Sequence, residues 1–390
     1  MRKTRLFTPG PTPLLPAAQQ AMAAADLHHR TPEFRALLGR VRAGLKQFMN
    51  TGNEVLVLTS SGSGAMEAAV SNLVNAGEAV AVISAGKFGE RWVELCRGFG
   101  CDVRVISAEY GKTIAAEQLR RELTPELRAV FLQATESSTG VRHDVAGVTE
   151  LLKGRDTLLV LDAITGLGTT RLEVDGKIDV LIGGSQKALM CPPGLAFCSV
   201  SERAWTRMES CTQPRYYFDL RRERKAQEKN ESAFTPAVPL FAALDAALAC
   251  VGEMGGGSVA KGRDELIANA ERLAAVTRAA VVAGGLDLFA PESPAAAMTA
   301  IQAPAGVSAT EIVRRVKAVF GGILSDGQGE MKGRMFRIAH LGYFDYLDTL
   351  GILGALEQVL CAVAPEKFRT GAMVAAAQEA YAKKEMAAGG

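Results

Sequence analysis

Three short segments of the 390-residue chain combine residue types that could bind a ligand or perform chemistry. Residues 59–67 read TSSGSGAME, residues 159–164 read LVLDAI, and residues 183–194 read GGSQKALMCPPG. Each lies at or just past an apolar run that predicts a buried strand. Ligands of parallel sheets bind outside the carboxyl ends of the strands, so we expect the three segments to face a common site.

The first segment is rich in small residues that let the backbone approach an anion. Ser63, Gly64 and Ala65 stand where a strand turns into a helix, and the N-terminus of a helix offers free N–H groups and a positive dipole end. The segment is neither a Walker loop nor the dinucleotide-binding G-x-G-x-x-G. An ordinary tight turn would explain the same residues, so phosphate binding is one of two interpretations.

Asp162 and Lys187 are the reactive residues of the other two segments. Asp162 closes an apolar strand, where an acid could also serve as a helix cap or an ion-pair partner. Lys187 lies among small and apolar residues, and partial burial there would lower its pKa and suit Schiff-base chemistry. Alternatively, this lysine could pair with a bound phosphate or an acid.

Taken together, the three segments supply the parts that pyridoxal phosphate needs. Its aldehyde requires an amine, its pyridine nitrogen a carboxylate, and its phosphate hydrogen-bond donors. The lysine follows the acid by 25 residues in the chain.

The elements that would position these residues alternate between strands and helices. Apolar runs alternate with helical or loop segments, which is typical of a mainly parallel sheet covered on both faces in an α/β protein. The expected strands span residues 54–59, 79–84, 102–106, 129–133, 157–161 and 179–182, and the expected helices include 15–25, 32–48, 64–74, 88–99, 236–253 and 258–283.

Prolines and glycines suggest how the chain is divided. Residues 7–13 contain three prolines and a glycine, which predicts an extended arm, and Gly255, Gly256 and Gly257 separate two helical stretches. We therefore expect an N-terminal arm at 1–18, a large domain at 19–257 and a small α+β domain at 258–390.

Composition indicates a globular protein without a general electrostatic attraction to polyanions. Hydrophobic residues make up 48% and charged residues 22%, which excludes a disordered chain. A net charge of +2 predicts no general attraction to nucleic acid or membranes, and no uncharged apolar stretch approaches the ~20 residues of a membrane helix. Seven scattered cysteines without C-x-x-C, and no apolar signal segment at residues 1–12, predict a cytoplasmic protein with reduced thiols.

The chain resembles the class V aminotransferases of fold type I, in the branch of alanine–glyoxylate and serine–pyruvate aminotransferases. The matching motifs follow the family's order over nearly the whole chain: TPGPT at 8–12, HRTPEF at 29–34, SGSG at 61–64, ESSTG at 136–140, LD at 161–162, GSQKA at 184–188, PPG at 192–194 and RIAHLG at 337–342. The resemblance implies a PLP-transferase fold, with a mainly parallel seven-stranded sheet between helices and a smaller α+β C-terminal domain.

The resemblance also implies a role for individual residues around pyridoxal 5'-phosphate. Lys187 would form the Schiff base and move the proton between the substrate α-carbon and the cofactor, and Asp162 would pair with the pyridinium nitrogen. Phe88 would stack on the ring, where several relatives use tryptophan. The remaining cofactor contacts would come from Ser63, Gly64, Ala65 and Gln186 at the phosphate and from Ser137 beside the 3-hydroxyl group.

Other implied residues concern the substrate and a second subunit. Arg337 would bind the substrate carboxylate through two parallel N–H bonds, or would instead tie the small domain to the large one. Gly10 and Ser137 would also line the substrate site. Thr235 matches a threonine that reaches the phosphate from the partner, which predicts a homodimer with shared sites, although Ser232 replaces a tyrosine found in some relatives.

The implied activity is a ping-pong transfer of an amino group from alanine, serine or aspartate to glyoxylate or pyruvate. An aminotransferase for 2-aminoethylphosphonate or phosphoserine is an alternative that would need additional cations near the distal anion of the substrate, for which Arg30 and Arg215 are candidates. A cysteine desulfurase would usually have histidine in place of Gln186 and a mobile reactive cysteine, whereas Cys361 lies in an apolar helical run. A non-catalytic relative would be expected to lack the lysine or the acid.

Overall fold

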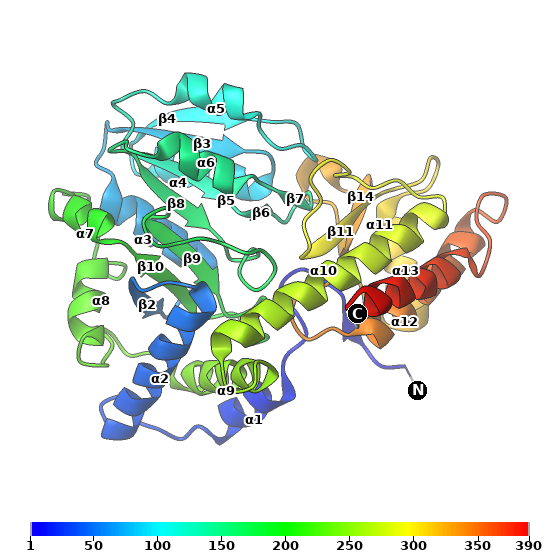
Figure 1. Cartoon of the computed structure of the whole chain (residues 1–390), viewed down its shortest axis with the longest axis horizontal. Helices are drawn as coiled ribbons and strands as arrows, with labels where there is room; N and C mark the ends of the chain where they lie inside the picture. The colour runs from blue at the N-terminus through cyan, green and yellow to red at the C-terminus, as the bar shows by residue number, and fades with distance from the viewer. Residues whose placement is uncertain (1, 389–390) are drawn as a thin grey trace.

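A seven-stranded sheet forms the centre of the larger part of the computed structural model, which describes residues 2–388 (Figure 1). Its strand order is β2-β10-β9-β8-β5-β3-β4, and only β10 runs antiparallel to its neighbours. The strands are β2 (Glu54–Leu58), β3 (Ala79–Ser84), β4 (Asp102–Ser107), β5 (Ala129–Gln133), β8 (Leu158–Asp162), β9 (Val180–Gly184) and β10 (Ala196–Val200). The mainly parallel seven-stranded sheet expected from the resemblance is confirmed.

Alternate residues of the strands face two different apolar clusters, which explains why the strand segments are apolar throughout. Val55 and Val57 of β2 belong to one cluster, and Leu56 and Leu58 belong to the other. The first face is covered mainly by α2 (Pro32–Met49), α5 (Ala116–Glu122), α6 (Val145–Leu152) and α9 (Val238–Met254), and the second by α3 (Gly62–Leu73), α4 (Lys87–Gly98), α7 (Glu202–Glu209) and α8 (Leu220–Gln227).

Strand β10 is the one strand of this sheet that is not among the strands expected from the sequence. Residues 196–200 read AFCSV and include a single β-branched residue, so local propensity does not mark them strongly as a strand. The strand forms because it pairs along its whole length with β2 on one side and β9 on the other.

A third apolar cluster, with its own three-stranded sheet, forms the smaller part. The strand order is β11-β14-β13, with β11 (Met298–Gln302), β13 (Ser325–Asp326) and β14 (Met335–Ala339). The helices around it are α10 (Val259–Ala283), α11 (Ala309–Phe320), α12 (Tyr346–Val363) and α13 (Ala372–Ala388), and this part also contains β12 (Gly322–Ile323) and the short helix η1 (Gly329–Met331). Strands β6 (Thr135–Glu136) and β7 (Val141–Arg142) form a separate two-stranded ribbon.

Helix α10 belongs to both parts. Leu266 packs into a core cluster of the large sheet, whereas Leu273 and Val276 pack into the cluster of the small sheet. Figure 1 shows α10 running from α9 toward β11 and α13. The domain division at residues 257 and 258 stays a prediction, and positions 1, 389 and 390 of the expected outer segments lie outside the described residues.

The N-terminal arm also joins the two parts. Its strand β1 (Arg5–Leu6) pairs with β12, and the Phe7 ring stacks on Phe344 with centroids 5.6 Å apart. Farther along, the backbone N–H of Thr12 donates to Gln186 (3.1 Å), before α1 (Pro16–Ala24) begins. The arm thus crosses from β12 and the apolar cluster of the smaller part to the loop that follows β9.

Helix α12 is long and apolar enough to cross a membrane by length and composition, as is the strongly bent pair α9 and α10 if counted as one span. Core helices of globular proteins pass the same test. Ile352, Leu353 and Leu356 of α12 are buried in the small-domain cluster, which accounts for its apolar composition.

Candidate active site

The carboxyl ends of five strands meet at one edge of the large sheet. Because β10 is antiparallel to both neighbours, β2 points in the same direction as β9, β8, β5 and β3. The loops that follow these five strands begin near residues 59, 85, 134, 163 and 185. They carry most of the residues that the sequence predicts for the site, although these residues extend over more than 120 positions of the chain, from Ser63 to Lys187.

Lys187 lies in the loop after β9 and is only 8% exposed. Its Nζ donates a hydrogen bond to the carbonyl oxygen of Pro9 (2.6 Å), and its own carbonyl accepts one from the hydroxyl of Thr12 (2.9 Å). Burial lowers the pKa of Lys187 to about 8; the charge of Arg337 lowers it further, and Asp162 opposes the shift. A larger fraction of this amine is therefore neutral near pH 7 than for an exposed lysine.

Asp162 ends strand β8 and is 6% exposed. One carboxylate oxygen accepts a hydrogen bond from the backbone N–H of Ile164 (2.9 Å). Burial raises the pKa of Asp162 to about 6, and the charge of Glu136 adds to the rise, while Lys187 lowers it. A buried carboxylate of this kind favours a cationic partner, which the protonated ring nitrogen of pyridoxal phosphate would supply.

Glu136, to which sequence reasoning gave no role, connects two loops of the site. One carboxylate oxygen accepts from the backbone N–H groups of Phe88 (3.1 Å) and Gly89 (3.0 Å), at the start of α4. The other accepts from the N–H (3.1 Å) and hydroxyl (2.5 Å) of Ser138. Burial raises the pKa of Glu136. The signal available in the sequence was an acid three residues after an apolar strand, inside the quoted motif at 136–140.

The expected phosphate cradle lies at the start of α3. Ser61 occupies the N-cap without forming a side-chain cap, although its carbonyl already accepts from the N–H of Gly64 (2.9 Å). The Ser63 hydroxyl accepts from a guanidinium nitrogen of Arg91 (3.1 Å), and Ala65 is buried. Nearby in the loop after β9, the side-chain oxygen of Gln186 is buried without a hydrogen-bond partner among the described residues.

This set of groups fits pyridoxal phosphate. It offers an amine of lowered pKa, a buried carboxylate, and a helix N-terminus whose cap side chain makes no hydrogen bond. The buried Oε1 of Gln186 has no partner among the described residues, and because an amide oxygen accepts hydrogen bonds, a donor group of the ligand could satisfy it.

Arg337 reaches the site from strand β14 of the small sheet and is 4% exposed. It donates to the backbone carbonyls of Ser137 (2.6 Å) and Asp326 (2.8 Å), while its Nε has no partner among the described residues. Burial lowers its pKa to about 10, so the guanidinium stays charged at neutral pH. The contact with Ser137 is a tie between the two domains, and the unpartnered Nε leaves a donor for an anion.

Gly10 of the arm lies directly against the lysine. A Cβ atom on this glycine would lie 2.2 Å from the Nζ of Lys187, and φ is +155°. Phe88 is half-buried at the start of α4, and Ser137 is 3% exposed. The structure therefore brings Gly10, Lys187, Ser137 and Arg337 to the same region between the two domains.

Thr235 is placed differently from the other predicted residues. It is exposed, in the segment between α8 and α9, where the Ser232 hydroxyl donates to the carbonyl of Phe234 (2.6 Å). It shares the lining of a small cavity with Thr59 and Tyr217. No hydrogen bond joins Thr235 to the other predicted site residues within the described part of the chain.

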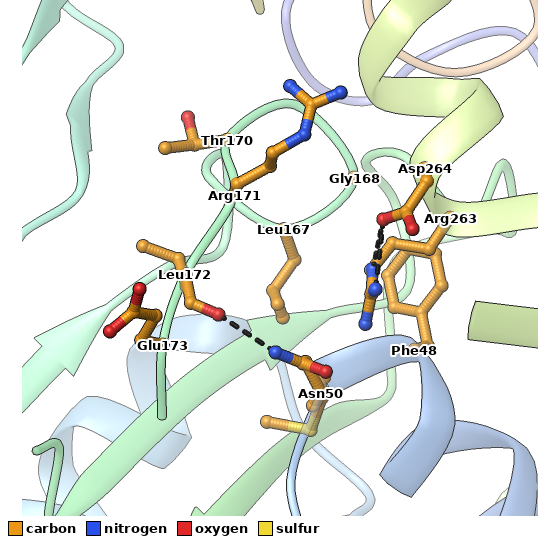
Figure 2. Close-up of a pocket in the computed structure, with 11 residues that line it drawn as sticks. Phe48, Asn50, Leu167, Gly168, Thr170, Arg171, Leu172, Glu173, Arg263 and Asp264 are labelled. Carbon is orange, nitrogen blue, oxygen red and sulfur yellow. Dashed lines mark hydrogen bonds and ion pairs between the residues drawn. The ribbon is translucent and has the colours of Figure 1, made fainter. Parts of the chain in front are cut away.

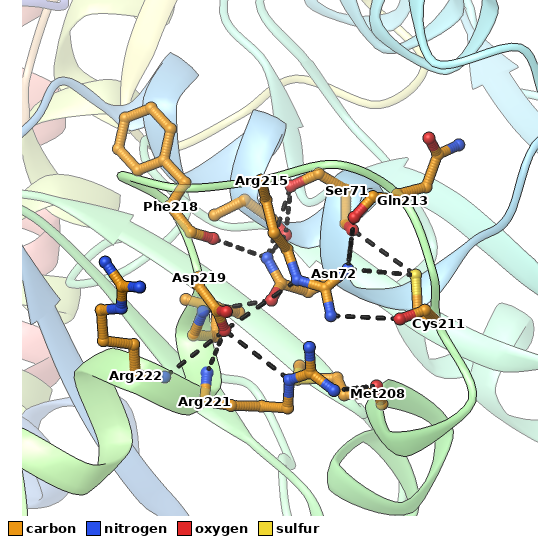
Figure 3. Close-up of polar contacts among 12 residues, drawn as sticks. Ser71, Asn72, Met208, Cys211, Gln213, Arg215, Phe218, Asp219, Arg221 and Arg222 are labelled. Carbon is orange, nitrogen blue, oxygen red and sulfur yellow. Dashed lines mark hydrogen bonds and ion pairs between the residues drawn. The ribbon is translucent and has the colours of Figure 1, made fainter.

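The two arginines considered for a distal substrate anion are not free at this site. Arg215 has a side chain 4% exposed and donates to the carbonyls of Ser71 (3.1 Å), Gln213 (2.8 Å) and Cys211 (3.1 Å), as Figure 3 shows. Arg30 has a side chain 57% exposed and lies 3.9 Å from Glu231. Arg215 therefore stabilises the loop before α8.

A separate cavity of about 270 Å³ contains none of the predicted site residues (Figure 2). Two arginines contribute to its lining, and each is paired with an acid: Arg263 with Asp264 (2.9 Å) and Arg171 with Glu271 (3.0 Å). Its charged groups are thus already compensated within the chain.

A buried lysine and acid at the carboxyl edge of a mainly parallel sheet, next to a phosphate cradle, define the class as a PLP-dependent transferase of this fold. Residues 16–283 match the family model described as aminotransferase class-V. The chain therefore belongs to the class V aminotransferase family and is a PLP-dependent aminotransferase.

Three similar proteins illustrate this relationship. The soluble hydrogenase 42 kDa subunit of Anabaena cylindrica is 39% identical, over 97% of this chain and 99% of that protein. The L-aspartate–glyoxylate aminotransferase of Paracoccus denitrificans is 31% identical, over 98% and 97% respectively. The solved aspartate aminotransferase of subgroup IV from Thermus thermophilus is 34% identical, with a TM-score of 0.84 over 92% of this chain and 99% of that one.

The name of the Anabaena relative describes a different chemistry and belongs to that protein. Among the side chains that the structure describes, residues 2–383, no group of three or more His, Cys, Asp or Glu is arranged to hold a metal ion. The reactive side chains at the carboxyl edge of the large sheet are instead the amine of Lys187 and the carboxylate of Asp162.

Proposed function

We propose that this aminotransferase moves the amino group of a small amino acid, namely alanine, serine or aspartate, to glyoxylate or pyruvate. The observation that carries the proposal is the buried Nζ of Lys187, whose pKa responds to both Asp162 and Arg337. An amine that lies within the electrostatic reach of both an acid and a guanidinium suits a substrate that carries its own carboxylate beside the reacting carbon. The names of the Paracoccus and Thermus proteins, which both include aspartate, support the donor class.

Each residue has a definite task in this mechanism. When bound, pyridoxal phosphate supplies an aldehyde for the amine and a ring that accepts electrons from the substrate α-carbon. Asp162 keeps a proton on the ring nitrogen, and Lys187 takes the proton from the α-carbon and returns it during the reverse half-reaction. Arg337 orients the substrate carboxylate. Pro9 and Gly10 of the arm limit the access of water to Nζ.

We also propose that the chain works as a homodimer in the cytoplasm. The exposure of Thr235 supports a role across an interface, as do the neighbouring Tyr216 (70% exposed) and Tyr217 (44%), which form an aromatic group with Phe234. The seven free cysteines are compatible with a reducing compartment.

The other activities considered from the sequence receive less support. Enzymes that bind phosphonate or phosphate substrates need extra cations, whereas Arg215 is engaged by backbone carbonyls and Arg30 is exposed. A cysteine desulfurase needs a mobile reactive thiol, whereas Cys361 lies within α12. We therefore do not propose either activity.

The substitution Lys187→Ala tests the proposal directly. We expect the absorbance band of the covalently bound cofactor to disappear and kcat to fall by at least about 10³-fold, because both the Schiff-base amine and the proton carrier are lost. Lys177→Ala is the control, since Lys177 is an exposed lysine paired with Glu173. A Lys187→Ala protein that keeps the band and its turnover would exclude this mechanism.

Single half-reactions identify the substrates. The loaded enzyme is mixed with alanine, serine or aspartate, and conversion of the cofactor from its aldehyde to its amine form is followed by absorbance. Glyoxylate or pyruvate should then restore the aldehyde form. If none of these donors converts the cofactor, the proposed substrate class is wrong even where the cofactor is bound.

A further inference from the structure

Arg91 is a half-buried cation beside the phosphate cradle that sequence reasoning did not use. It lies on α4, one turn after Phe88, and its guanidinium carbon is 4.8 Å from the centroid of the Phe88 ring. Its Nη1 donates to the hydroxyl of Ser63 on α3 (3.1 Å). Arg91 forms no ion pair with a carboxylate among the described side chains of residues 2–383, although its charge lowers the pKa of Asp162.

The hydrogen bond from Arg91 fixes how Ser63 can act. A hydroxyl has one proton to donate and accepts through its lone pairs. When the oxygen accepts from Arg91, the proton of Ser63 is directed to another acceptor, and the N-terminal turn of α3 is where the resemblance expects an anion. The contact with Arg91 therefore orients the Ser63 hydroxyl so that its proton can be donated to an anion at the start of α3.

The charge of Arg91 also matches the ligand expected there. A phosphate monoester carries close to two negative charges at neutral pH. The other phosphate contacts expected within this chain, the Gly64 and Ala65 amides and the Gln186 side chain, are uncharged. A guanidinium partly removed from water, with no acid as a partner, is stabilised when an anion binds near it.

We propose that Arg91 is a positioning residue for the phosphate of pyridoxal phosphate. It holds Ser63 so that the hydroxyl proton is free for the phosphate, and it supplies positive charge to that end of the cofactor. This inference rests on the proposed role of the Lys187 site as the cofactor site. The inference adds one charged group, the guanidinium of Arg91, to the uncharged donors that were expected around the phosphate.

The test compares two aldehydes that differ only in the phosphate. Cofactor-free wild type, Arg91→Gln, Arg91→Lys and Ser63→Ala are titrated with pyridoxal phosphate and with pyridoxal, and binding is followed by absorbance and equilibrium dialysis. We expect Arg91→Gln to weaken pyridoxal phosphate binding at least about tenfold and pyridoxal binding less than about twofold. Arg91→Lys, which keeps the charge, should recover part of the loss.

A matched control separates this effect from a general loss of charge. Arg97→Gln removes one exposed arginine from the last turn of the same helix and should leave both affinities unchanged. If Arg91 acts through Ser63, the double variant Arg91→Gln/Ser63→Ala should bind pyridoxal phosphate better than the product of the two single losses predicts.

Two results would overturn the inference. One is an Arg91→Gln protein with unchanged affinity for pyridoxal phosphate. The other is an equal loss for both aldehydes, which would assign Arg91 to the ring side through Phe88. A wild-type chain that binds neither aldehyde at Lys187 would instead overturn the proposed function. Thermal unfolding of the cofactor-free variants monitors their folding. If Arg91→Gln does not fold, the pyridoxal phosphate affinities of Ser63→Ala and Arg91→Lys still test the role of the contact between Arg91 and Ser63.

Discussion

Burial moves the pKa values of two site residues toward neutrality. Lys187 is lowered to about 8 and Asp162 is raised to about 6, in each case mainly because the charged form loses its contact with water. The folded protein without its cofactor therefore holds both charges at a cost in free energy. The ring nitrogen and the aldehyde of the cofactor offer partners that reduce this cost, so the same burial favours binding.

Asp162→Asn should stabilise the cofactor-free protein at neutral pH. The pKa of Asp162 is raised from 3.8 to about 6, so the folded state retains a proton that the unfolded state loses between about pH 4 and 6. The free energy of unfolding should fall across this range by up to ~3 kcal/mol because of this one group. The amide of Asn keeps an oxygen for the N–H of Ile164 and does not titrate.

Chemical denaturation from pH 4.5 to 7.5 measures this difference. The stability of Asp162→Asn relative to wild type should increase with pH, while the cofactor is bound more weakly because the ring nitrogen loses its carboxylate. A difference in stability that does not change with pH would contradict the raised pKa.

Arg337→Ala should raise KM for every amino donor by about 10- to 100-fold, the effect of losing a charge-assisted bond to a carboxylate. Cofactor affinity should change little. Arg334→Ala, three residues earlier and exposed, is the control for the small domain. Thermal unfolding will register the loss of the contact between Arg337 and Ser137, and an unchanged KM would assign Arg337 to that domain tie alone.

At the scale of elements, the site depends on short loops that are fixed at both ends. Glu136 fastens the start of α4 to the turn after β5, and the arm is hydrogen-bonded to the loop that carries Lys187. Such contacts hold side chains from different loops in one arrangement before the ligand arrives, which reduces the ordering required on binding. Phe88 and Ser137 should therefore shift together if Glu136 is changed.

Gly10→Ala tests whether the close approach of the arm matters. A Cβ atom at this position would lie 2.2 Å from the Nζ of Lys187, so the arm or the lysine must move. We expect kcat to fall at least about tenfold, because a displacement near 1 Å misaligns the amine. Gly98→Ala is the control, since a Cβ atom on Gly98 would meet open space. Wild-type kcat in Gly10→Ala would show that the arm adapts without cost.

For the molecule as a whole, several features join the two parts of the chain, among them the arm, the shared helix α10 and the contact of Arg337 with Ser137. The reacting groups therefore come from both parts. If Thr235 serves the partner's phosphate, a complete site would also require a second subunit.

Mixed dimers test that requirement. Thr235→Glu should block cofactor binding by placing a carboxylate against the phosphate, and Lys187→Ala should be inactive on its own. Coexpressed, the two chains should form dimers in which one site has an intact Lys187 and an intact partner Thr235, so about half the activity per mixed dimer should return. Size-exclusion chromatography measures the assembly. Mixed dimers without activity would place Thr235 in the site of its own chain.

The sequence by itself determined the main architecture and its reactive residues. Strands covered on both faces must be apolar throughout, so six of the seven strands are visible as local runs. The ends of β2, β8 and β9 bring Ser63, Asp162 and Lys187, respectively, to one edge. The order of motifs was specific enough to indicate the family, which the comparison confirmed.

Tertiary structure alone decided how other residues are used. Strand β10 forms through pairing with two distant strands, and Glu136 has a role only because the loops after β3 and β5 lie together. Arg215 and Arg91 are both arginines near turns, yet one is surrounded by carbonyl oxygens and the other contacts a hydroxyl at a helix start. Local sequence cannot distinguish them, because the partners of a long charged side chain are set by chain segments far away in the sequence.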